Sequence, residues 1–154
     1  MRMSIGGCDF DLAPWAYNEE PENDPELSNM NGIDERDRIK LQQIKRLKEV
    51  SQVQNLRIKG AAWSSPRWMK SNNKWTGFSH LKTEYYQTWA NYHVKWLELM
   101  EENGLPIWAI STGNEPLNGV AFMFFVKFMS LGWTPGNQVS ERKRNEELKC
   151  EIIK

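Results

Sequence analysis

The residues best suited to chemistry are Asn114 and Glu115, in the run Ser-Thr-Gly-Asn-Glu-Pro that begins at residue 111. They follow an apolar stretch, 106–110, that is typical of a short buried strand, and a glycine and a proline around the pair end that strand. In a parallel barrel, catalytic groups lie at the carboxyl ends of the strands. A carboxylic acid beside an amide suits glycoside hydrolysis, because the acid protonates the leaving oxygen and the amide holds a sugar hydroxyl. An ordinary polar turn is the alternative interpretation.

Two further segments have polar and aromatic residues in a similar arrangement. Residues 2–10 are Arg-Met-Ser-Ile-Gly-Gly-Cys-Asp-Phe, and residues 62–70 are Ala-Trp-Ser-Ser-Pro-Arg-Trp-Met-Lys. Together with the Asn-Glu-Pro run, in this order and at this spacing, they resemble the lysosomal glucosylceramidases (acid β-glucosidases) of glycoside hydrolase family 30. The runs Tyr-Gln-Thr-Trp-Ala and Gly-Trp-Thr-Pro, which begin at residues 86 and 132, extend the resemblance over nearly the whole chain.

The resemblance implies roles for four residues that would contact the substrate. Glu115 would be the general acid/base, kept protonated at rest by burial or by a neighbouring carboxylate, and Asn114 would hold the sugar 2-hydroxyl. Asp9 and Trp63 would bind hydroxyls on the far side of a glucose ring, since a carboxylate can accept hydrogen bonds from two hydroxyls and an indole N–H is a directional donor. Without the resemblance, Asp9 would be interpreted as a loop-capping carboxylate and Trp63 as a core aromatic residue.

Two supporting residues follow from the same resemblance. Arg2 would orient the catalytic nucleophile from its strand, and Phe10 would shape the wall of the pocket. We predict that Trp68 packs in the core rather than binding a ligand. His93 lies on the apolar face of a predicted helix, so we predict a core histidine rather than a catalytic one.

The resemblance implies a retaining β-glucosidase that hydrolyses glucosylceramide to glucose and ceramide, a reaction of sphingolipid metabolism. Such an enzyme needs a second carboxylate, the nucleophile, about 5 to 5.5 Å from the first. In this family the nucleophile is a glutamate at the end of a later barrel strand. The glutamates that follow Glu115 all lie in a charged, helix-like tail: Glu141, Glu146, Glu147 and Glu151. We therefore predict that the nucleophile is missing from this chain and that the chain alone is inactive.

Two alternatives stay open. The chain could be a non-catalytic truncated product that binds a sugar or a partner protein, or part of another retaining β-glycosidase with an Asn-Glu-Pro motif. The runs Cys-Asp-Phe and Trp-Ser-Ser-Pro favour the glucosylceramidases over that last group. The phenylalanine-rich segment 119–131 is longer and more apolar than its family counterpart. Three alternatives stay open for it: an altered loop, a lipid-facing patch and a mistranslated splice junction.

The predicted fold is α/β and is a partial TIM barrel. A (β/α)8 barrel needs about 250 residues, whereas this chain has 154. Alternating apolar runs and amphipathic stretches predict about three parallel strands with helices covering one side of the sheet. The strands are expected near 2–7, 56–62 and 106–111, and the helices near 34–50 and 83–102. The first helix has one apolar stripe, formed by Leu41, Ile44, Leu47 and Val50. The second has one apolar face, formed by Tyr86, Trp89, His93, Leu97 and Met100. A final helix is expected from Thr134-Pro135, a good N-cap and N1 pair. Residues 1–154 would then be an internal part of a family 30 catalytic domain, with no β-sandwich domain.

Composition excludes several other classes of function. Basic and acidic residues number 20 each, so no net field favours nucleic acid. His80 and His93 lack the ligand spacing of a zinc site, so we expect no metal and no cofactor. No apolar run approaches the length of a membrane span, and the N-terminus lacks the apolar stretch of a signal peptide.

The resemblance also implies partners and a location. They are glucosylceramide or a related β-glucoside, peripheral contact with a membrane surface, a lipid-presenting activator protein, and the lysosome.

Overall fold

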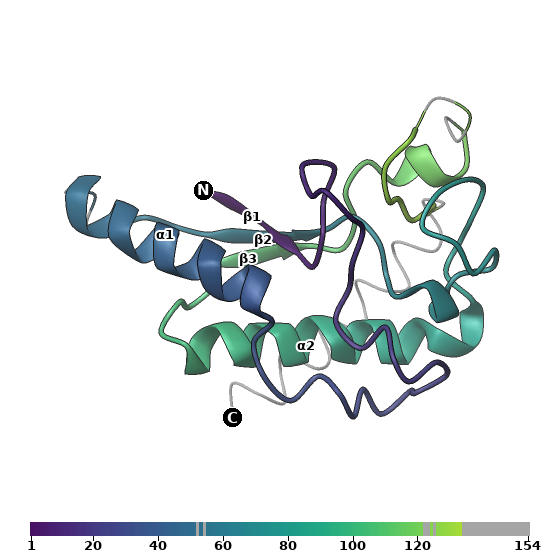
Figure 1. Cartoon of the computed structure of the whole chain (residues 1–154), viewed down its shortest axis with the longest axis horizontal. Coiled ribbons are helices and arrows are strands. Elements are labelled where there is room, and N and C mark those ends of the chain that lie inside the picture. Colours follow the sequence, from purple (N-terminus) through teal and green to yellow (C-terminus); the bar gives the residue numbers. More distant parts are fainter. Residues whose placement is uncertain (52, 54, 122–123, 125, 134–154) are drawn as a thin grey trace.

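Three short parallel strands form one sheet in the order β1-β2-β3. The computed structural model describes residues 1–51, 53, 55–121, 124 and 126–133. The strands are β1 (Arg2–Ile5), β2 (Lys59–Ala62) and β3 (Ala109–Ser111), and residues 2, 59 and 109 lie in register. All three predicted strands are confirmed, although each is shorter than its predicted range. The predicted burial of the third strand is wrong: β3 lies at the edge of the described sheet and is only half-buried, and Trp108 just before it is 62% exposed. The sheet of the described residues is not closed into a barrel, as Figure 1 shows.

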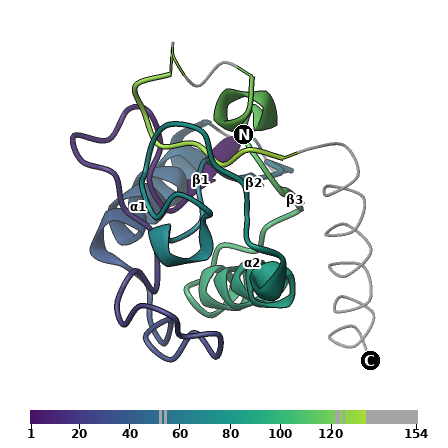
Figure 2. The same ribbon diagram turned by 90° about the vertical axis from the view of Figure 1, so that its right-hand side faces the viewer.

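One helix lies in each connection between neighbouring strands. Helix α1 (Glu35–Ser51) connects β1 to β2, and helix α2 (Tyr86–Glu102) connects β2 to β3. Three short 3-10 turns, η1 (Arg67–Met69), η2 (Thr83–Tyr85) and η3 (Pro116–Gly119), lie in the loops. Figure 2 shows both long helices on the same side of the strands, as the sequence predicts.

The core lies between this face of the sheet and the two helices. Trp96 of α2 packs directly on Gly60 of β2, where a Cβ atom would lie 2.7 Å from the indole ring. This contact requires glycine, because any side chain at residue 60 would collide with the ring. The periodicity of the sequence correctly predicted that Trp89 and Met100 of α2 are buried, but it did not single out Trp96.

The predicted apolar stripe of α1 is only half correct. Leu41 and Ile44 are buried, whereas Leu47 and Val50 are exposed by 42% and 68%. The reason is length: a helix of 17 residues extends about 25 Å, whereas a four-residue strand extends only about 13 Å. The last turns of α1 therefore project beyond the sheet, as Figure 1 shows.

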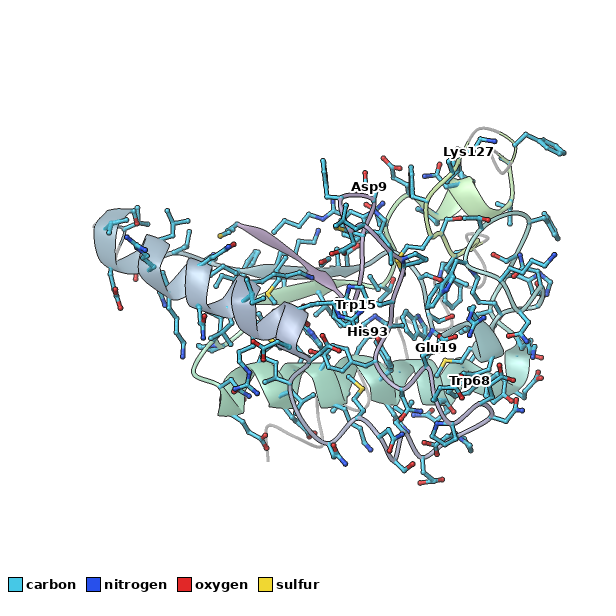
Figure 3. All side chains as sticks on the ribbon, in the orientation of Figure 1. Asp9, Trp15, Glu19, Trp68, His93 and Lys127 are labelled. Carbon is cyan, nitrogen blue, oxygen red and sulfur yellow. The ribbon has the colours of Figure 1, made fainter. Side chains whose placement is uncertain are left out.

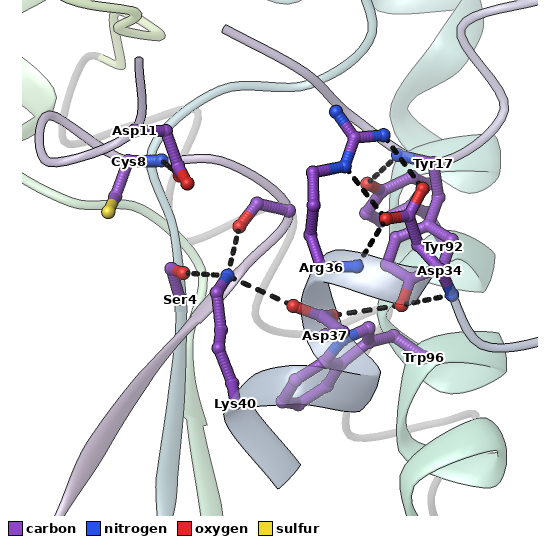
Figure 4. Close-up of polar contacts among 11 residues, drawn as sticks. Ser4, Cys8, Asp11, Tyr17, Asp34, Arg36, Asp37, Lys40, Tyr92 and Trp96 are labelled. Carbon is purple, nitrogen blue, oxygen red and sulfur yellow. Dashed lines mark hydrogen bonds and ion pairs between the residues drawn. The ribbon is translucent and has the colours of Figure 1, made fainter. Parts of the chain in front are cut away.

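A buried carboxylate connects the two helices to the end of β1. Asp37 of α1 is fully buried and accepts hydrogen bonds from the hydroxyl of Tyr17 at 2.9 Å and the indole of Trp96 at 3.1 Å. The ammonium of Lys40 lies 3.0 Å from the same carboxylate and also donates to Ser4 of β1 at 2.7 Å (Figure 4). Burial raises the pKa of Asp37, and the charge of Lys40 opposes that shift. The network therefore holds β1 against both helices.

Candidate active site

The turn that follows β3 positions the Asn-Glu pair. The backbone N–H of Asn114 donates to the carbonyl of Ala62 at 2.7 Å, so the turn is attached to the end of β2. Glu115 has φ 45° and ψ 63°, in the left-handed region. Non-glycine residues are uncommon there, and such strained positions cluster at functional sites. Pro116 then begins η3 and fixes the direction in which the chain leaves the turn.

Arg2, the first residue of β1, contacts one residue that follows β2 and one that follows β3. Its Nη2 atom donates to Oδ1 of Asn114 at 2.5 Å, and its guanidinium carbon lies 4.7 Å from the centre of the Trp63 ring. These three predicted site residues are thus in contact. The predicted role of Arg2 toward a nucleophile stays a prediction, since the contacts of its guanidinium here are to an amide and an indole.

The carboxyl of Glu115 does not have the surroundings that we expected from sequence. Its side chain is exposed rather than buried, and its Oε2 atom accepts a hydrogen bond of 2.7 Å from the side-chain amide of Asn118. The backbone N–H of Asn118 also donates to the Glu115 carbonyl at 2.9 Å. Sequence reasoning missed Asn118. The available signal was an asparagine three residues after the acid, at the close of a turn whose second residue is proline.

A surface cavity of about 610 Å³ runs between β1 and α1. Three predicted site residues, Arg2, Phe10 and Trp63, line it together with apolar side chains of α1 that include Leu47. Phe10 is 90% exposed, so it forms part of a wall rather than part of the core. The indole nitrogen of Trp63 is buried without a hydrogen-bond acceptor among the described residues. The indole nitrogens of Trp15, Trp89 and Trp133 are buried in the same way, so this feature alone does not mark a ligand site.

Asp9 lies on the loop that leaves β1 and is exposed. Tight packing shapes this loop: a Cβ atom at Gly7 would lie 2.8 Å from the Trp15 ring, and Gly7 donates its N–H to the Trp15 carbonyl at 3.0 Å. Figure 3 shows Asp9 beyond the end of the sheet. Asp9 and Glu115 therefore both lie in loops that follow the carboxyl ends of parallel strands in the same sheet. Their convergence on one cleft stays a prediction.

Two residues that we predicted to be structural are buried. Trp68 is 1% exposed and donates from its indole to the carbonyl of Asn18 at 2.8 Å. His93 is fully buried, and its Nδ1 atom lies 2.8 Å from the carbonyl of Trp89. Burial lowers the pKa of His93 to about 4, and the hydrogen bond to Trp89 opposes that shift. Both predictions are confirmed.

Several sequence predictions concern parts of the chain that the structure does not describe. The four glutamates after Glu115, a helix expected from residue 134, and the charged segment 141–154 all lie outside the described residues. Phe122 and Phe125 of the phenylalanine-rich segment lie outside them as well.

The described part of the chain contains no cluster of three or more histidine, cysteine, aspartate and glutamate side chains that could hold a metal ion. Within the same residues, no helix has the length and apolar character needed to cross a membrane.

Comparison with known proteins identifies the family. Residues 1–145 match the glycosyl hydrolase family 30 TIM-barrel domain. The chain belongs to glycosyl hydrolase family 30. The partial TIM-barrel fold that we predicted from the sequence is therefore confirmed.

Relatives within family 30 differ in what their names say they hydrolyse. The chain is 33% identical over 142 residues to the lysosomal acid glucosylceramidase of Mus musculus, covering 90% of the chain and 27% of that enzyme. It is 31% identical over 134 residues to the endo-1,6-β-D-glucanase BGN16.3 of Trichoderma harzianum, covering 79% of the chain and 27% of that enzyme.

A solved structure of the endo-β1,6-glucanase BT3312 superimposes with a TM-score of 0.81 at 25% identity, covering 97% of the chain and 33% of that protein. The chain thus spans about a quarter to a third of the length of these family 30 proteins.

Proposed function

We propose that this chain forms part of the active site of a retaining β-glycosidase, with Glu115 as its general acid/base. The observation that supports this most is that one side chain, Arg2, contacts both Trp63 and Asn114, which follow the carboxyl ends of the neighbouring parallel strands β2 and β3. In a parallel barrel this is the end at which substrates are converted. The turn conformation of Glu115 directs its side chain away from the core, where a glycosidic oxygen can reach it.

The Arg2 contact also defines what Asn114 offers to a sugar. An amide has one acceptor oxygen and two N–H donors, and an arginine only donates. Because Oδ1 of Asn114 accepts from Arg2, the two N–H groups of this amide remain for a sugar hydroxyl. In the first step Glu115 would give its proton to the departing oxygen, and in the second it would take a proton from water.

Two further residues would hold the same sugar ring. The indole N–H of Trp63, buried without an acceptor among the described residues, would donate to one ring hydroxyl. The exposed carboxylate of Asp9 would accept hydrogen bonds from one or two other hydroxyls. Phe10 would cover an apolar face of the ligand from the cavity wall. No cofactor takes part in this scheme.

The substrate that we favour is glucosylceramide, cleaved to glucose and ceramide. The Cys-Asp-Phe and Trp-Ser-Ser-Pro runs and the 33% identity to the mouse glucosylceramidase support it. Lysosomal location, contact with a membrane surface and a lipid-presenting activator protein belong to this same proposal. A β-1,6-glucan is the second candidate, since the structural match to an endo-β1,6-glucanase has a TM-score of 0.81.

The test uses a longer protein in which this chain is followed by the remaining strands of the barrel. Hydrolysis of glucosylceramide, a fluorogenic β-glucoside and a β-1,6-glucan is measured side by side, and the anomer first released is identified. We expect retention of configuration and preference for the glucosides. Inversion would contradict the mechanism, and a preference for the glucan would replace the substrate.

Glu115→Gln tests the assigned acid. It should slow substrates with poor leaving groups most, because these depend most on proton donation. Glu102→Gln, at the exposed end of α2, is the matched control. Unaltered hydrolysis by Glu115→Gln would overturn the acid assignment. Binding of glucosides without hydrolysis by the unsubstituted longer protein would favour the non-catalytic sugar-binding alternative.

A further inference from the structure

Lys70 has a side-chain amino group that is buried among loop segments of the chain. Its side chain is fully buried, and its Nζ atom donates to the carbonyl of Trp75 at 2.9 Å and to the carbonyl of Ser130 at 2.8 Å. No ion pair involves Lys70 within the described part of the chain. A buried charge that is not paired with an opposite charge is costly, so its position calls for an explanation.

The two carbonyls belong to a junction of three loop segments, formed by residues 75–80, Gly119 and residues 130–132. The backbone N–H of Ser79 donates to the Gly119 carbonyl at 2.9 Å, and that of Gly132 donates to the Ser79 carbonyl at 3.1 Å. The approach is so close that only glycine fits at two positions. A Cβ atom on Gly119 would lie 2.2 Å from the nitrogen of Gly132, and one on Gly132 would lie 2.2 Å from the oxygen of Ser79.

This junction supports the turn that contains Glu115. Trp133 follows it directly, and its backbone N–H donates to the Pro116 carbonyl at 3.1 Å. The Trp133 ring also lies against Gly113, where a Cβ atom would be 3.4 Å from the ring. Residues 113 and 116, on either side of the Asn-Glu pair, therefore both rest on Trp133. Whatever holds residues 130–132 in place also holds this turn.

We infer that Lys70 is a positioning residue that holds the Glu115 turn by fastening residues 130–132 to the loop 71–81. It is the side chain that connects the two segments through its own hydrogen bonds, while the remaining bonds of the junction are between backbone groups. The effect of this positioning on catalysis rests on the function proposed for Glu115. The positioning itself can be measured without an activity assay.

The arrangement should depend on pH. Burial lowers the pKa of Lys70 to about 7, and the charge of Glu19 opposes that shift. When the junction opens and water reaches Lys70, its pKa returns toward about 10.4. The closed junction therefore binds the proton less tightly than the open one. Its stability is greatest at high pH, falls as the pH drops toward 7, and stays constant below that value.

The experiment measures opening by thiol labelling of the full chain. In a background with Cys8 and Cys150 replaced by serine, Ser130→Cys places a thiol inside the junction, where residue 130 is 2% exposed. Thr88→Cys, at a residue of α2 that is 5% exposed, reports opening of the whole fold. Labelling rates are divided by those of the unfolded chain at each pH. Lys70→Met is compared with Lys82→Met. Lys82 lies in the same connection between β2 and α2, and among the described residues its ammonium donates to one carbonyl, that of Trp68.

We expect Lys70→Met to accelerate labelling at residue 130 about tenfold or more at pH 7.5, with little change at residue 88, and Lys82→Met to change both by less than about twofold. Protection of residue 130 should rise from pH 7 to 9.5 in the unmodified chain but not in Lys70→Met. Lys70→Gln, which keeps a neutral donor, should restore part of the protection without the pH dependence.

Equal labelling of residue 130 with and without Lys70 would overturn the inference, as would equal acceleration at residue 88. These results are distinct from failure of the proposed function. If Glu115→Gln leaves hydrolysis intact while the labelling result holds, the acid/base assignment falls and the role of Lys70 in the junction stands.

Discussion

Arg2 and Asn114 are joined by a hydrogen bond of 2.5 Å although β2 lies between their strands. Arg2 begins β1 and Asn114 follows β3, so the guanidinium reaches across the middle strand, and it passes over the Trp63 ring that follows β2. One side chain thereby couples the orientation of an amide and an indole that are both proposed to touch the same sugar.

Arg2→Lys should impair the site. Lysine keeps the charge but loses the planar guanidinium that bonds Asn114 while lying on Trp63. In the longer enzyme we expect kcat/KM for a fluorogenic β-glucoside to fall by about 10 to 100-fold, since small misplacements of binding groups cost this much. Arg57→Lys is the matched control, because Arg57 lies over exposed Trp108 at 4.9 Å. Equal losses in both variants would argue against a specific role for Arg2.

Asn118→Ala should disturb the proposed acid. The amide of Asn118 holds the Glu115 carboxyl at 2.7 Å, and without it this exposed side chain gains rotational freedom. We expect kcat to fall about 3- to 10-fold for glucosides with poor leaving groups and to change little for activated ones. Asn91→Ala, which removes a Gln87 contact on the surface of α2, is the control. A uniform loss for all leaving groups would indicate a structural effect instead.

His93 should make the fold sensitive to acid. Burial lowers its folded pKa to about 4, below the unfolded value of 6.5, so its contribution to stability is present above pH 6.5 and is lost as the pH falls toward 4. Between pH 7 and 4.5 the wild-type chain should lose roughly 2 to 3 kcal/mol more unfolding free energy than His93→Gln.

Denaturant unfolding at the two pH values measures this difference. His80→Gln is the control, since His80 is exposed. An identical pH dependence in wild type and His93→Gln would show that His93 does not titrate in this range.

The chain of 154 residues should show no measurable hydrolysis of a fluorogenic β-glucoside. It contains the proposed acid but no match to the family nucleophile, and a retaining mechanism needs both carboxylates. The assay compares the purified chain with its Glu115→Gln variant. Turnover above that variant would mean that a second carboxylate of this chain completes the site. Exposed edges of β1 and β3 should also favour association, which light scattering would detect.

What the sequence by itself determined is mostly local. The apolar run before Asn114 and the glycine and proline around the pair were enough to predict that these residues follow a strand, because turn chemistry acts within a few residues. The periodicity of α2 likewise predicted that His93 and Trp89 are buried. The ordered motifs also indicated the family, since each of them is a continuous segment.

Only the tertiary structure decided which of these segments touch. Arg2 is 112 positions from Asn114, and Lys70 is 60 positions from Ser130. No local pattern encodes such pairs, because they depend on strand register and on how closely backbones approach at Gly119 and Gly132. The exposure of Leu47 and Val50 has the same origin: the helical period predicts a face, but the length of the neighbouring strands decides how much of that face is covered.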